Sequence, residues 1–513
     1  MQVNYIVVQA GGKGTRMGQM TYNRPKALVP VENLPILFHL FRKFPEKKYL
    51  IIGDYKKDVL KSYLHTFANV SYEFIDAGGK EGTCAGLPQA LDRVPEGEAL
   101  MLIWSDLILP ESYELPKEAT NYVGLSGDFP CRWKYESGRF LEEGSTEYGV
   151  AGFFLFTGKD WLKGVPQEGE FVRWLQGQSI SFAVQSLQRT KEYGILAEYQ
   201  KLERQKCRPF NRMTDMGTYI IKEPVDRQGE ELAEHEVAWY EKVRSYGFGN
   251  IPIIYGTHPL KMERINGKNI YEYQLDRTQK ENILRGLIDC IRQIHRLESC
   301  PASKESYYEA YVGKTFRRLE KIRKLVPFAG KEKIYINGRE CANIFYHKEE
   351  IKALVQRYIP ETFNLLHGDC TFSNMMLRDD MIPVLIDPRG YFGFMQFYGD
   401  PVYDWVKVYY SLAGNYDQFN LKRFVLKIEE TEVFLEISSN HWEDMEDTFF
   451  RLLEGEVTIQ QIKLFHALIW LSLTTYTWED YDSICGAFYK GLLVLLEVDG
   501  YGKKADADME NGI

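Results

Sequence analysis

The stretch that decides the fold of the first half of the chain is YIVVQAGGKGTRM, residues 5–17. Its first five residues form an apolar run, which predicts a buried strand, and the glycines that follow predict a tight turn. Glycine adopts positive φ angles at little cost, so such a turn lets backbone N–H groups converge on an anion. With PKAL following at 25–28, the motif predicts a phosphate-binding loop directly after a first strand.

This motif begins an alternating pattern that covers the first 200 residues or so. Apolar runs that predict strands span residues 49–53, 71–75 and 99–104, and helix-like stretches span residues 36–43, 57–66 and 84–91. The alternation predicts an α/β domain with an open, mostly parallel, Rossmann-like sheet and helices on both faces. In such sheets ligands bind at the carboxyl ends of the strands.

Bulk properties narrow the class of protein. A chain of 513 residues is too long for one core, so we expect two to four domains. The net charge of −9 argues against a non-specific nucleic-acid binder, which would need a basic excess. Eight scattered cysteines without a CxxC pair predict reduced thiols and a cytoplasmic location. We expect no signal peptide and no membrane span, and the sequence leaves the oligomeric state open.

A second phosphate-handling signature lies about 350 residues further along, in HGD at 367–369 followed by Asn374. In kinase chemistry the aspartate of such a loop accepts the proton of the substrate hydroxyl, and the asparagine binds Mg²⁺. A second metal carboxylate is needed on a nearby strand. Asp387, which directly follows the apolar run 383–386, is placed to supply it.

The second half of the chain reads as a small β-rich lobe followed by a large helical lobe. Residues 217–222 predict a strand, and residues 230–244 predict an acidic helix. Spaced apolar positions then predict helices over residues 281–295, 308–325, 348–358 and within 460–497. This order is typical of protein-kinase-like folds.

Residues 1 to about 205 resemble the sugar-phosphate and phosphocholine nucleotidyltransferases of the MobA-like NTP transferase family. The resemblance implies that Arg16 and Lys26 act on the phosphates and that Asp106, after strand 99–104, binds the metal. It also implies nucleotide contacts from Ala10, Gly11, Gly12, Gly14, Thr15, Gly82 and Thr83. The stretch EYG at 192–194 departs from the DxGT pattern of the family. Glu192 is therefore either the second Mg²⁺ ligand or an ordinary solvated glutamate.

Residues from about 208 to 500 resemble the aminoglycoside phosphotransferase and choline kinase family. The resemblance implies that Lys222 contacts the ATP phosphates and that Glu236 is its helix partner, with Glu234 as a rival. It implies that Asp369 is the catalytic base, and that the metal ligands are Asn374 and Asp387. No glycine-rich phosphate loop is present, so residues 210–217 would have to take that role.

Two clues to the acceptor disagree. The stretch DPRG at 387–390, followed by Gly399-Asp400-Pro401 and Asp404, resembles family members that act on polyhydroxylated sugars and aminocyclitols. Asp404 is expected to order the metal loop. A cage for a quaternary ammonium is the other possibility, with the aromatic candidates Trp405, Tyr409, Trp470, Tyr476 and Trp478. Aromatics at helical spacing are more often core residues. We therefore favour a sugar or polyol.

These observations predict a nucleotidyltransferase domain at 1–206, a kinase domain at 207–502 and a polar tail at 503–513. We expect a bifunctional, Mg²⁺-dependent enzyme that phosphorylates a small sugar or polyol with ATP. It would then couple the product to an NTP, CTP or UTP, giving an activated precursor for capsule or other surface polysaccharide. Its partners would be small molecules only. The alternatives are a choline kinase joined to a CTP:phosphocholine cytidylyltransferase, and a nucleotide-sensing scaffold with one inactive domain.

Overall fold

The computed structural model describes residues 1–194, 196, 199 and 211–502. The chain divides into two units: Met1–Arg204 with Glu479–Asp482, and Gln205–Trp478 with Ser483–Ile513. The predicted joint near Cys207 and the polar tail lie outside the described residues, so the domain boundaries stay a prediction. The other seven cysteines are all free thiols.

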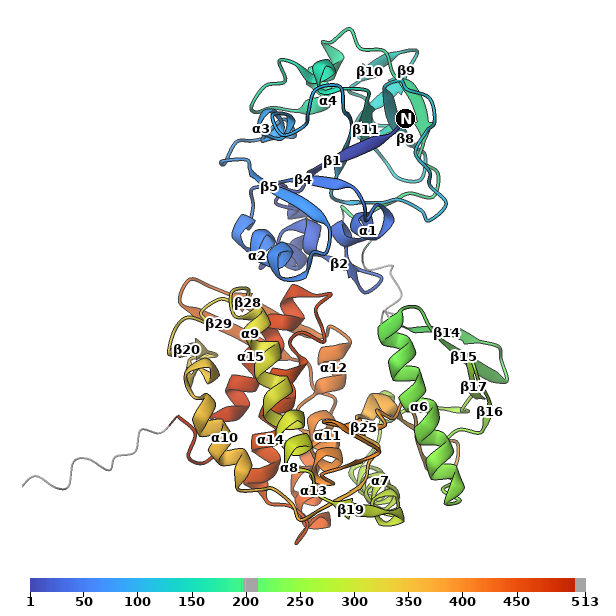
Figure 1. Cartoon of the computed structure of the whole chain (residues 1–513), viewed down its shortest axis with the longest axis vertical. Coiled ribbons are helices and arrows are strands. Elements are labelled where there is room, and N and C mark those ends of the chain that lie inside the picture. Colours follow the sequence, from blue (N-terminus) through green and yellow to red (C-terminus); the bar gives the residue numbers. More distant parts are fainter. Residues whose placement is uncertain (195, 197–198, 200–210, 503–513) are drawn as a thin grey trace, which may run out of the picture. The chain divides into compact units, whose positions relative to one another are not determined.

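The first unit is built on a nine-stranded mixed sheet, drawn in blue to teal in Figure 1. The strands β6 (Ala99–Trp104), β1 (Val3–Gln9), β4 (Lys48–Gly53) and β5 (Ser71–Asp76) lie side by side and parallel. Beyond β6, the strand β11 (Gly149–Phe156) runs antiparallel to it. The connections include α1 (Ile36–Lys43), α2 (Lys57–Phe67), α3 (Leu87–Leu91) and α4 (Phe171–Gln176). The predicted α/β class is confirmed, and the antiparallel strands make the sheet mixed.

The core of this unit explains where its site lies. Val7, Leu50 and Leu102, from the three central strands, are almost fully buried and pack with Leu87 of α3 and Phe154 of β11. Full burial of such side chains contributes about 1.5–3 kcal/mol each. In this register Gln9 at the end of β1 lies opposite Trp104 at the end of β6. The glycine loop and the segment of Asp106 therefore leave the sheet at the same edge.

The second unit begins with a four-stranded antiparallel sheet in the order β14-β15-β17-β16. The long helix α6 lies beside this sheet and contacts β15 (Figure 1). The bounds are β14 Asn211–Asp215, β15 Tyr219–Pro224, β16 Ile254–Thr257, β17 Leu260–Glu263 and α6 Arg227–Ser245. Asp226 caps α6 by accepting the backbone N–H of Gly229 at 2.8 Å. The turn between β14 and β15 holds Gly217 at φ +87°.

The rest of the second unit is mainly helical. Its longer helices are α7 (Arg277–Leu297), α9 (Lys314–Ile322), α10 (Lys348–Gln356), α11 (Val402–Leu412), α14 (Ile459–Leu473) and α15 (Tyr481–Leu495). Every residue of α11 is buried, as expected for a helix at the centre of a lobe. No helix in the described ranges is long and apolar enough to cross a membrane.

Gly152 marks a close approach between β11 and β6. Its φ is +77°, and a Cβ there would lie 2.0 Å from the indole of Trp104. Trp104 ends the strand that leads to Asp106. The absence of a side chain at 152 thus lets β11 pass the last residue before the candidate site.

We predict that Gly152→Ala lowers the free energy of unfolding of the full chain by about 2–4 kcal/mol, since a left-handed residue and a forced core contact each cost about 1–3 kcal/mol. Gly97→Ala is the control, because Gly97 has φ +76° but open space around it. The Gly97→Ala variant should lose only the part of the free energy of unfolding that the positive φ angle costs. Equal losses in chemical denaturation would contradict the close-approach argument.

Candidate active sites

The glycine loop of the first unit closes tightly at Gly14. This residue has φ +63°, and its carbonyl accepts hydrogen bonds from the Met17 N–H at 2.8 Å and the Thr21 hydroxyl at 3.2 Å. A Cβ at Gly14 would lie 3.2 Å from the Cβ of Lys26. The loop is therefore folded against the segment that carries Lys26.

The other residues of the glycine loop are either buried against the sheet or exposed at the rim of the loop. Ala10 is 1% exposed, and its N–H donates to Ile52 at 2.8 Å, which anchors the loop to the sheet. The rim is exposed to solvent and consists of Gly12, Lys13, Thr15 and Arg16, with Gly11 half-buried. This arrangement leaves the N–H groups of the rim accessible to an anionic ligand.

Lys26 lies between two carboxylates. Its ammonium contacts Asp106 and is 3.8 Å from Oε1 of Glu192. Glu192 belongs to the short strand β13 (Lys191–Glu192), which pairs with β7 (Leu107–Ile108), so that Glu192 lies opposite Leu107. The Tyr193 N–H also donates to the Asp106 carbonyl at 3.1 Å. Two segments far apart in sequence are thereby joined at the site.

The structure shows how far the side chain of Glu192, which departs from the family pattern, is exposed to solvent. Its side chain is 15% exposed, and burial and then Asp106 raise its pKa, against the opposing charges of Lys26 and Arg16. Among the described residues, Oδ1 of Asp106 is buried without a hydrogen-bond donor. A carboxylate pair with an unsatisfied oxygen is a suitable Mg²⁺ donor set. Glu192 is not a solvated surface residue, and its role as metal ligand stays a prediction.

Gly82 and Thr83 lie beside the end of β1. A Cβ at Gly82 would come 2.2 Å from the carbonyl oxygen of Gly169, so only glycine fits there. The Thr83 hydroxyl accepts the Phe171 N–H at 2.7 Å, and the Thr83 carbonyl accepts Nε2 of Gln9 at 2.7 Å. These bonds tie the segment to the strand that precedes the glycine loop.

In the second unit, Lys222 connects the small lobe to the segment that carries Asp387. Its ammonium donates to Glu236 Oε2 at 2.7 Å and contacts the carboxylate of Asp387. Burial lowers the pKa of Lys222, but Asp387 and Glu236 outweigh burial and raise it, so the ammonium stays charged. Glu236 is buried whereas Glu234 is exposed, which makes Glu236 the partner of Lys222.

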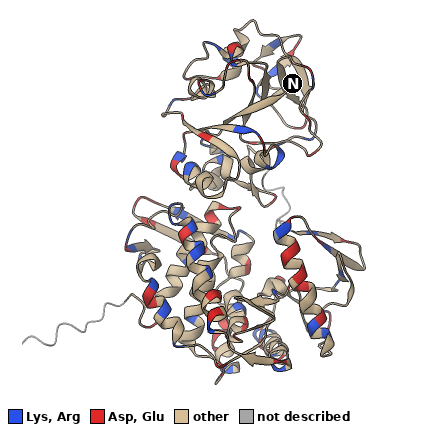
Figure 2. Cartoon of the chain, in the orientation of Figure 1, with Lys and Arg blue, Asp and Glu red and all other residues tan. Residues whose placement is uncertain are grey.

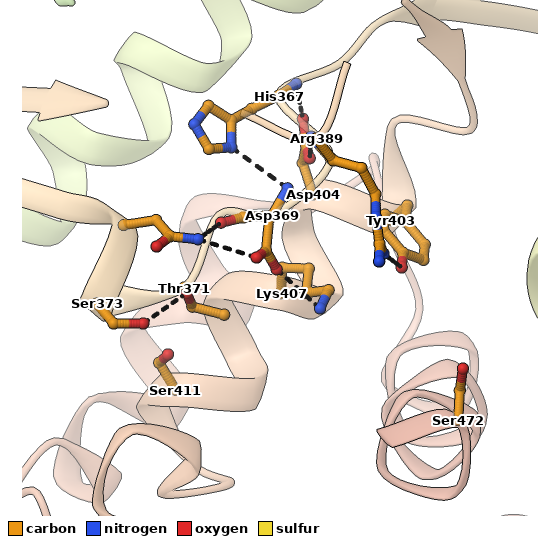
Figure 3. Close-up of polar contacts among 12 residues, drawn as sticks. His367, Asp369, Thr371, Ser373, Arg389, Tyr403, Asp404, Lys407, Ser411 and Ser472 are labelled. Carbon is orange, nitrogen blue, oxygen red and sulfur yellow. Dashed lines mark hydrogen bonds and ion pairs between the residues drawn. The ribbon is translucent and has the colours of Figure 1, made fainter. Parts of the chain in front are cut away.

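The catalytic loop is held by the buried carboxylate of Asp404, which a dashed line joins to His367 in Figure 3. Asp404 accepts the backbone N–H groups of His367 and Gly368, at 3.0 and 2.7 Å. Nε2 of His295 lies 3.0 Å from the same carboxylate. Burial raises the pKa of Asp404, but the hydrogen bond and charge of His295, with His367 and the Gly368 N–H, lower it below its usual value.

Asp369 and Asn374 face each other on this loop. The amide nitrogen of Asn374 donates to the carbonyl oxygen and to Oδ2 of Asp369, both at 2.9 Å. The strands β23 (Met375–Arg378) and β24 (Pro383–Leu385) form an antiparallel pair, and the Ile386 N–H donates to the Asn374 carbonyl at 3.0 Å. Asn374 and Asp387 therefore lie at the same end of this hairpin.

The oxygen donors of Asn374 and Asp387 suit Mg²⁺, which binds to one or two carboxylates and completes its shell with substrate phosphates and water. The side chain of Asp387 is 53% exposed and its φ is +59°, so it turns out of β24 toward solvent. No cluster of three or more His, Cys, Asp or Glu side chains able to hold a metal occurs in the described part of the chain.

The charge on Asp369 is set by two neighbouring cations (Figure 3). Nζ of Lys407 lies 2.9 Å from Oδ1 of Asp369. Burial raises the pKa of Asp369, but Lys407 and then Arg389 outweigh it and lower the pKa below its usual value. The carboxylate is therefore ionised at neutral pH, the state that a general base requires.

Comparisons with known proteins agree with this division of the chain. Residues 6–122 match the model of the MobA-like NTP transferase domain, and residues 208–424 match that of the phosphotransferase enzyme family. The chain carries one domain of each family. One relative, the bifunctional protein GlmU of Methanococcus vannielii, is 32% identical to this chain over 128 residues, which cover 23% of this chain and 28% of that protein.

A second relative of the NTP transferase domain is the UTP–glucose-1-phosphate uridylyltransferase AglF of Haloferax volcanii, with 31% identity over 100 residues, 19% of this chain and 41% of that protein. The matches thus span well under half of these relatives. Among solved structures, the CTP:phosphocholine cytidylyltransferase of Streptococcus pneumoniae is 18% identical, with a TM-score of 0.32, over 39% of this chain and 98% of that chain.

Several residues of the phosphotransferase site were not found from the sequence. Lys407 follows Asp404 by almost one helical turn, and His295 comes from α7. The only signal for either was a polar residue in an otherwise apolar helical stretch. Of the aromatic residues considered as a cage, Trp405, Tyr409 and Trp470 are at most 1% exposed and belong to the core.

We predict that Glu192→Gln raises the Mg²⁺ concentration needed for half-maximal pyrophosphate release by about 10–100-fold, the usual loss when a metal site is weakened. Glu192→Asp, which keeps the carboxylate, should lose less. Glu147→Gln, an exposed change in the same domain, is the control. An unchanged Mg²⁺ titration for Glu192→Gln would remove Glu192 from the metal site.

We also predict that Lys407→Met moves the acidic limb of the pH profile of kcat/KM for phosphorylation upward by about one unit or more, because a nearby opposite charge lowers a carboxyl pKa by about 1–3 units. The sign follows from Asp369, whose depressed pKa rises when the cation is removed. Lys427→Met, an exposed change, should leave the profile in place. A profile that does not move in Lys407→Met would show that Asp369 does not control it.

Proposed function

We propose that this chain is a bifunctional enzyme that phosphorylates a small hydroxylated metabolite with ATP and then transfers a nucleotidyl group to the product. The proposal depends chiefly on one observation, the position of Glu192 beside Lys26 and Asp106. With it, each unit has its own set of cations and oxygen donors for phosphate chemistry. This argues against a scaffold with one inactive domain.

In the phosphotransferase domain, Asp369 would accept the proton of the acceptor hydroxyl while that oxygen attacks the γ-phosphorus of ATP and ADP leaves. Lys222, oriented by Glu236, would hold the ATP phosphates. Mg²⁺ bound by Asn374 and Asp387 would neutralise charge on the phosphate oxygens. Since Asp404 holds the loop backbone, the base would already be in place before the acceptor binds.

In the NTP transferase domain, an oxygen of the acceptor phosphate would attack the α-phosphorus of the NTP, and pyrophosphate would leave. Arg16, Lys26 and the N–H groups of the glycine loop would stabilise the charge that develops on the phosphoryl oxygens. Asp106 and Glu192 would hold Mg²⁺, which supplies further charge neutralisation there. No proton transfer from a side chain is required.

A sugar or polyol acceptor and CTP or UTP remain our preferred substrates. Relatives of the NTP transferase domain include a glucose-1-phosphate uridylyltransferase and a glucose-1-phosphate cytidylyltransferase, which supports a sugar-phosphate reaction and a surface-glycan precursor as the product. The enzyme would work in the cytoplasm, where these nucleotides occur. Choline is disfavoured because three of the five cage aromatics are core residues, and Arg318 already lies 5.7 Å from the centroid of the Tyr476 ring.

The two half-reactions can be tested separately. Asp369→Asn should lower kcat for acceptor-dependent ATP consumption by about 10²–10⁴-fold, the usual value of a general base, and leave pyrophosphate release with a pre-phosphorylated acceptor unchanged. Lys26→Met should do the reverse. Asp289→Asn, exposed on α7, should change neither rate.

A screen for the substrates would combine sugars, polyols and amino alcohols with ATP and each NTP, and the products would be identified by mass. Unchanged ATP consumption in Asp369→Asn would overturn the assigned base. Absence of pyrophosphate release with all four NTPs and every phosphorylated acceptor would overturn the nucleotidyl transfer.

A further inference from the structure

Four basic side chains lie near one another in the phosphotransferase site, and two of them, Lys407 and Arg389, act on the charge of Asp369. Lys314 and Arg318 stand one turn apart on α9, Arg389 follows the metal-binding segment, and Lys407 lies on α11. Burial is the main cause that lowers the pKa of Lys314 far below its usual value, and the charges of Arg389, Arg318 and Lys407 lower it further. The four groups are thus close enough to repel one another.

These cations have few anionic partners. Of the four, Lys407 alone has a carboxylate partner in the described residues, Asp369 at 2.9 Å. Arg318 Nη1 donates to the carbonyl and hydroxyl of Ser472 at 2.6 and 3.0 Å. Arg389 Nη1 donates to the Tyr403 hydroxyl at 3.2 Å (Figure 3). Both arginines therefore bind neutral oxygens.

Lys314 is the least satisfied of the four. No hydrogen bond or ion pair joins its ammonium to any described residue, and its closest recorded aromatic contact is 5.8 Å from Nζ to the Tyr403 ring centroid. The charge of Glu309 raises the pKa of Lys314, but both carboxylate oxygens of Glu309 bind Arg317. Partly buried cations without counter-charges are costly to fold, so this arrangement favours a bound anion.

Two anions would come near Asp369 during the proposed reaction, the transferred phosphoryl group of ATP and an acidic group of the acceptor. The nucleotide side already has its own cation, because Lys222 contacts Asp387 on the segment expected to bind the metal. Lys314 and Arg318 come instead from a helix of the large lobe. Lys314 lies near Arg389 and Lys407, which are the two cations beside Asp369. This separation assigns them to the acceptor.

We propose that the acceptor of the phosphotransferase domain carries a negatively charged group, a carboxylate or a phosphate, and that Lys314, Arg318 and Arg389 bind it. The inference rests on the proposed kinase function and refines its substrate class. The hydroxyl would still lose its proton to Asp369, its oxygen would still attack the γ-phosphorus, and ADP would leave. Amino sugars, aminocyclitols and choline are excluded as good acceptors because a cation would be repelled.

The first test compares matched acceptors that differ only in charge: glucose, glucuronate and glucosamine, and glycerol, glycerate, glycerol 3-phosphate and 3-amino-1,2-propanediol. In ATP consumption assays the best acidic member should have a kcat/KM at least 10-fold higher than its neutral counterpart, and the amino member should be poorest. A neutral or amino member that matches or exceeds the acidic ones would overturn the proposal.

The second test uses neighbouring residues of one helix. Arg318→Met and Lys314→Met should raise KM for the acidic acceptor at least 10-fold and leave KM for ATP within about twofold. Arg317→Met is the matched control, since Arg317 is exposed and pairs with Glu309, and it should change neither constant. If the KM for ATP rises and that for the acceptor does not, the cations serve ATP and the proposal is wrong.

Binding separates failure of this inference from failure of the kinase function. Glucuronate, glycerate and inorganic phosphate would be titrated by calorimetry into the full chain, Arg318→Met and Arg317→Met. Binding that is lost only in Arg318→Met supports the anion site even if no acceptor is phosphorylated, an outcome that counts against the kinase function alone. Equal binding, or no binding, by the full chain and Arg318→Met overturns the anion site.

Discussion

The geometry of the phosphotransferase site depends on one buried carboxylate, that of Asp404. It accepts two consecutive backbone N–H groups of the catalytic loop and contacts His295, which ties the loop to α11 and α7 at once. A buried charge of this kind is stable only when its hydrogen bonds are complete, and loss of its partners costs about 3–5 kcal/mol. The same requirement fixes the loop, because any displacement of His367 or Gly368 would leave the carboxylate unsatisfied. Asp369 and Asn374 take their positions from that loop.

The two candidate sites balance charge in opposite ways. In the NTP transferase domain one ammonium, Lys26, is close to two carboxylates, so the site has room for a further positive charge. In the phosphotransferase domain one carboxylate, Asp369, lies beside two cations, Lys407 and Arg389, and Lys314 lies near both of these cations. The first imbalance suits a metal ion and the second suits an anionic substrate, because electrostatic interactions are stronger in partly buried sites than in water.

Much of the fold and part of each site could be predicted from local patterns. The apolar runs of β1, β4, β5 and β6, the glycine turn and the helix over 36–43 are all specified by neighbouring residues, and the structure has each of them. Glu192 could not be placed this way, because its position comes from the pairing of β13 with β7 and from Tyr193, which packs against Met17 and Ile36. The helical segment expected at 308–325 is likewise divided, with a π-helical stretch at Glu309–Gly313 before α9 begins.

The sequence by itself determined the order of the two domain types and the glycine loop after the first strand, and it predicted Asp369 as the base, since these depend on short contiguous motifs. Only the tertiary structure decided which acidic residue joins Asp106, that Glu236 and not Glu234 binds Lys222, and that Trp405, Tyr409 and Trp470 belong to the core. It alone also brought Lys314 and Arg318 close to Arg389, one of the two cations beside Asp369. The physical reason is that electrostatic interactions depend on distance in space, and residues of four separate segments become neighbours there only when the helical lobe is packed.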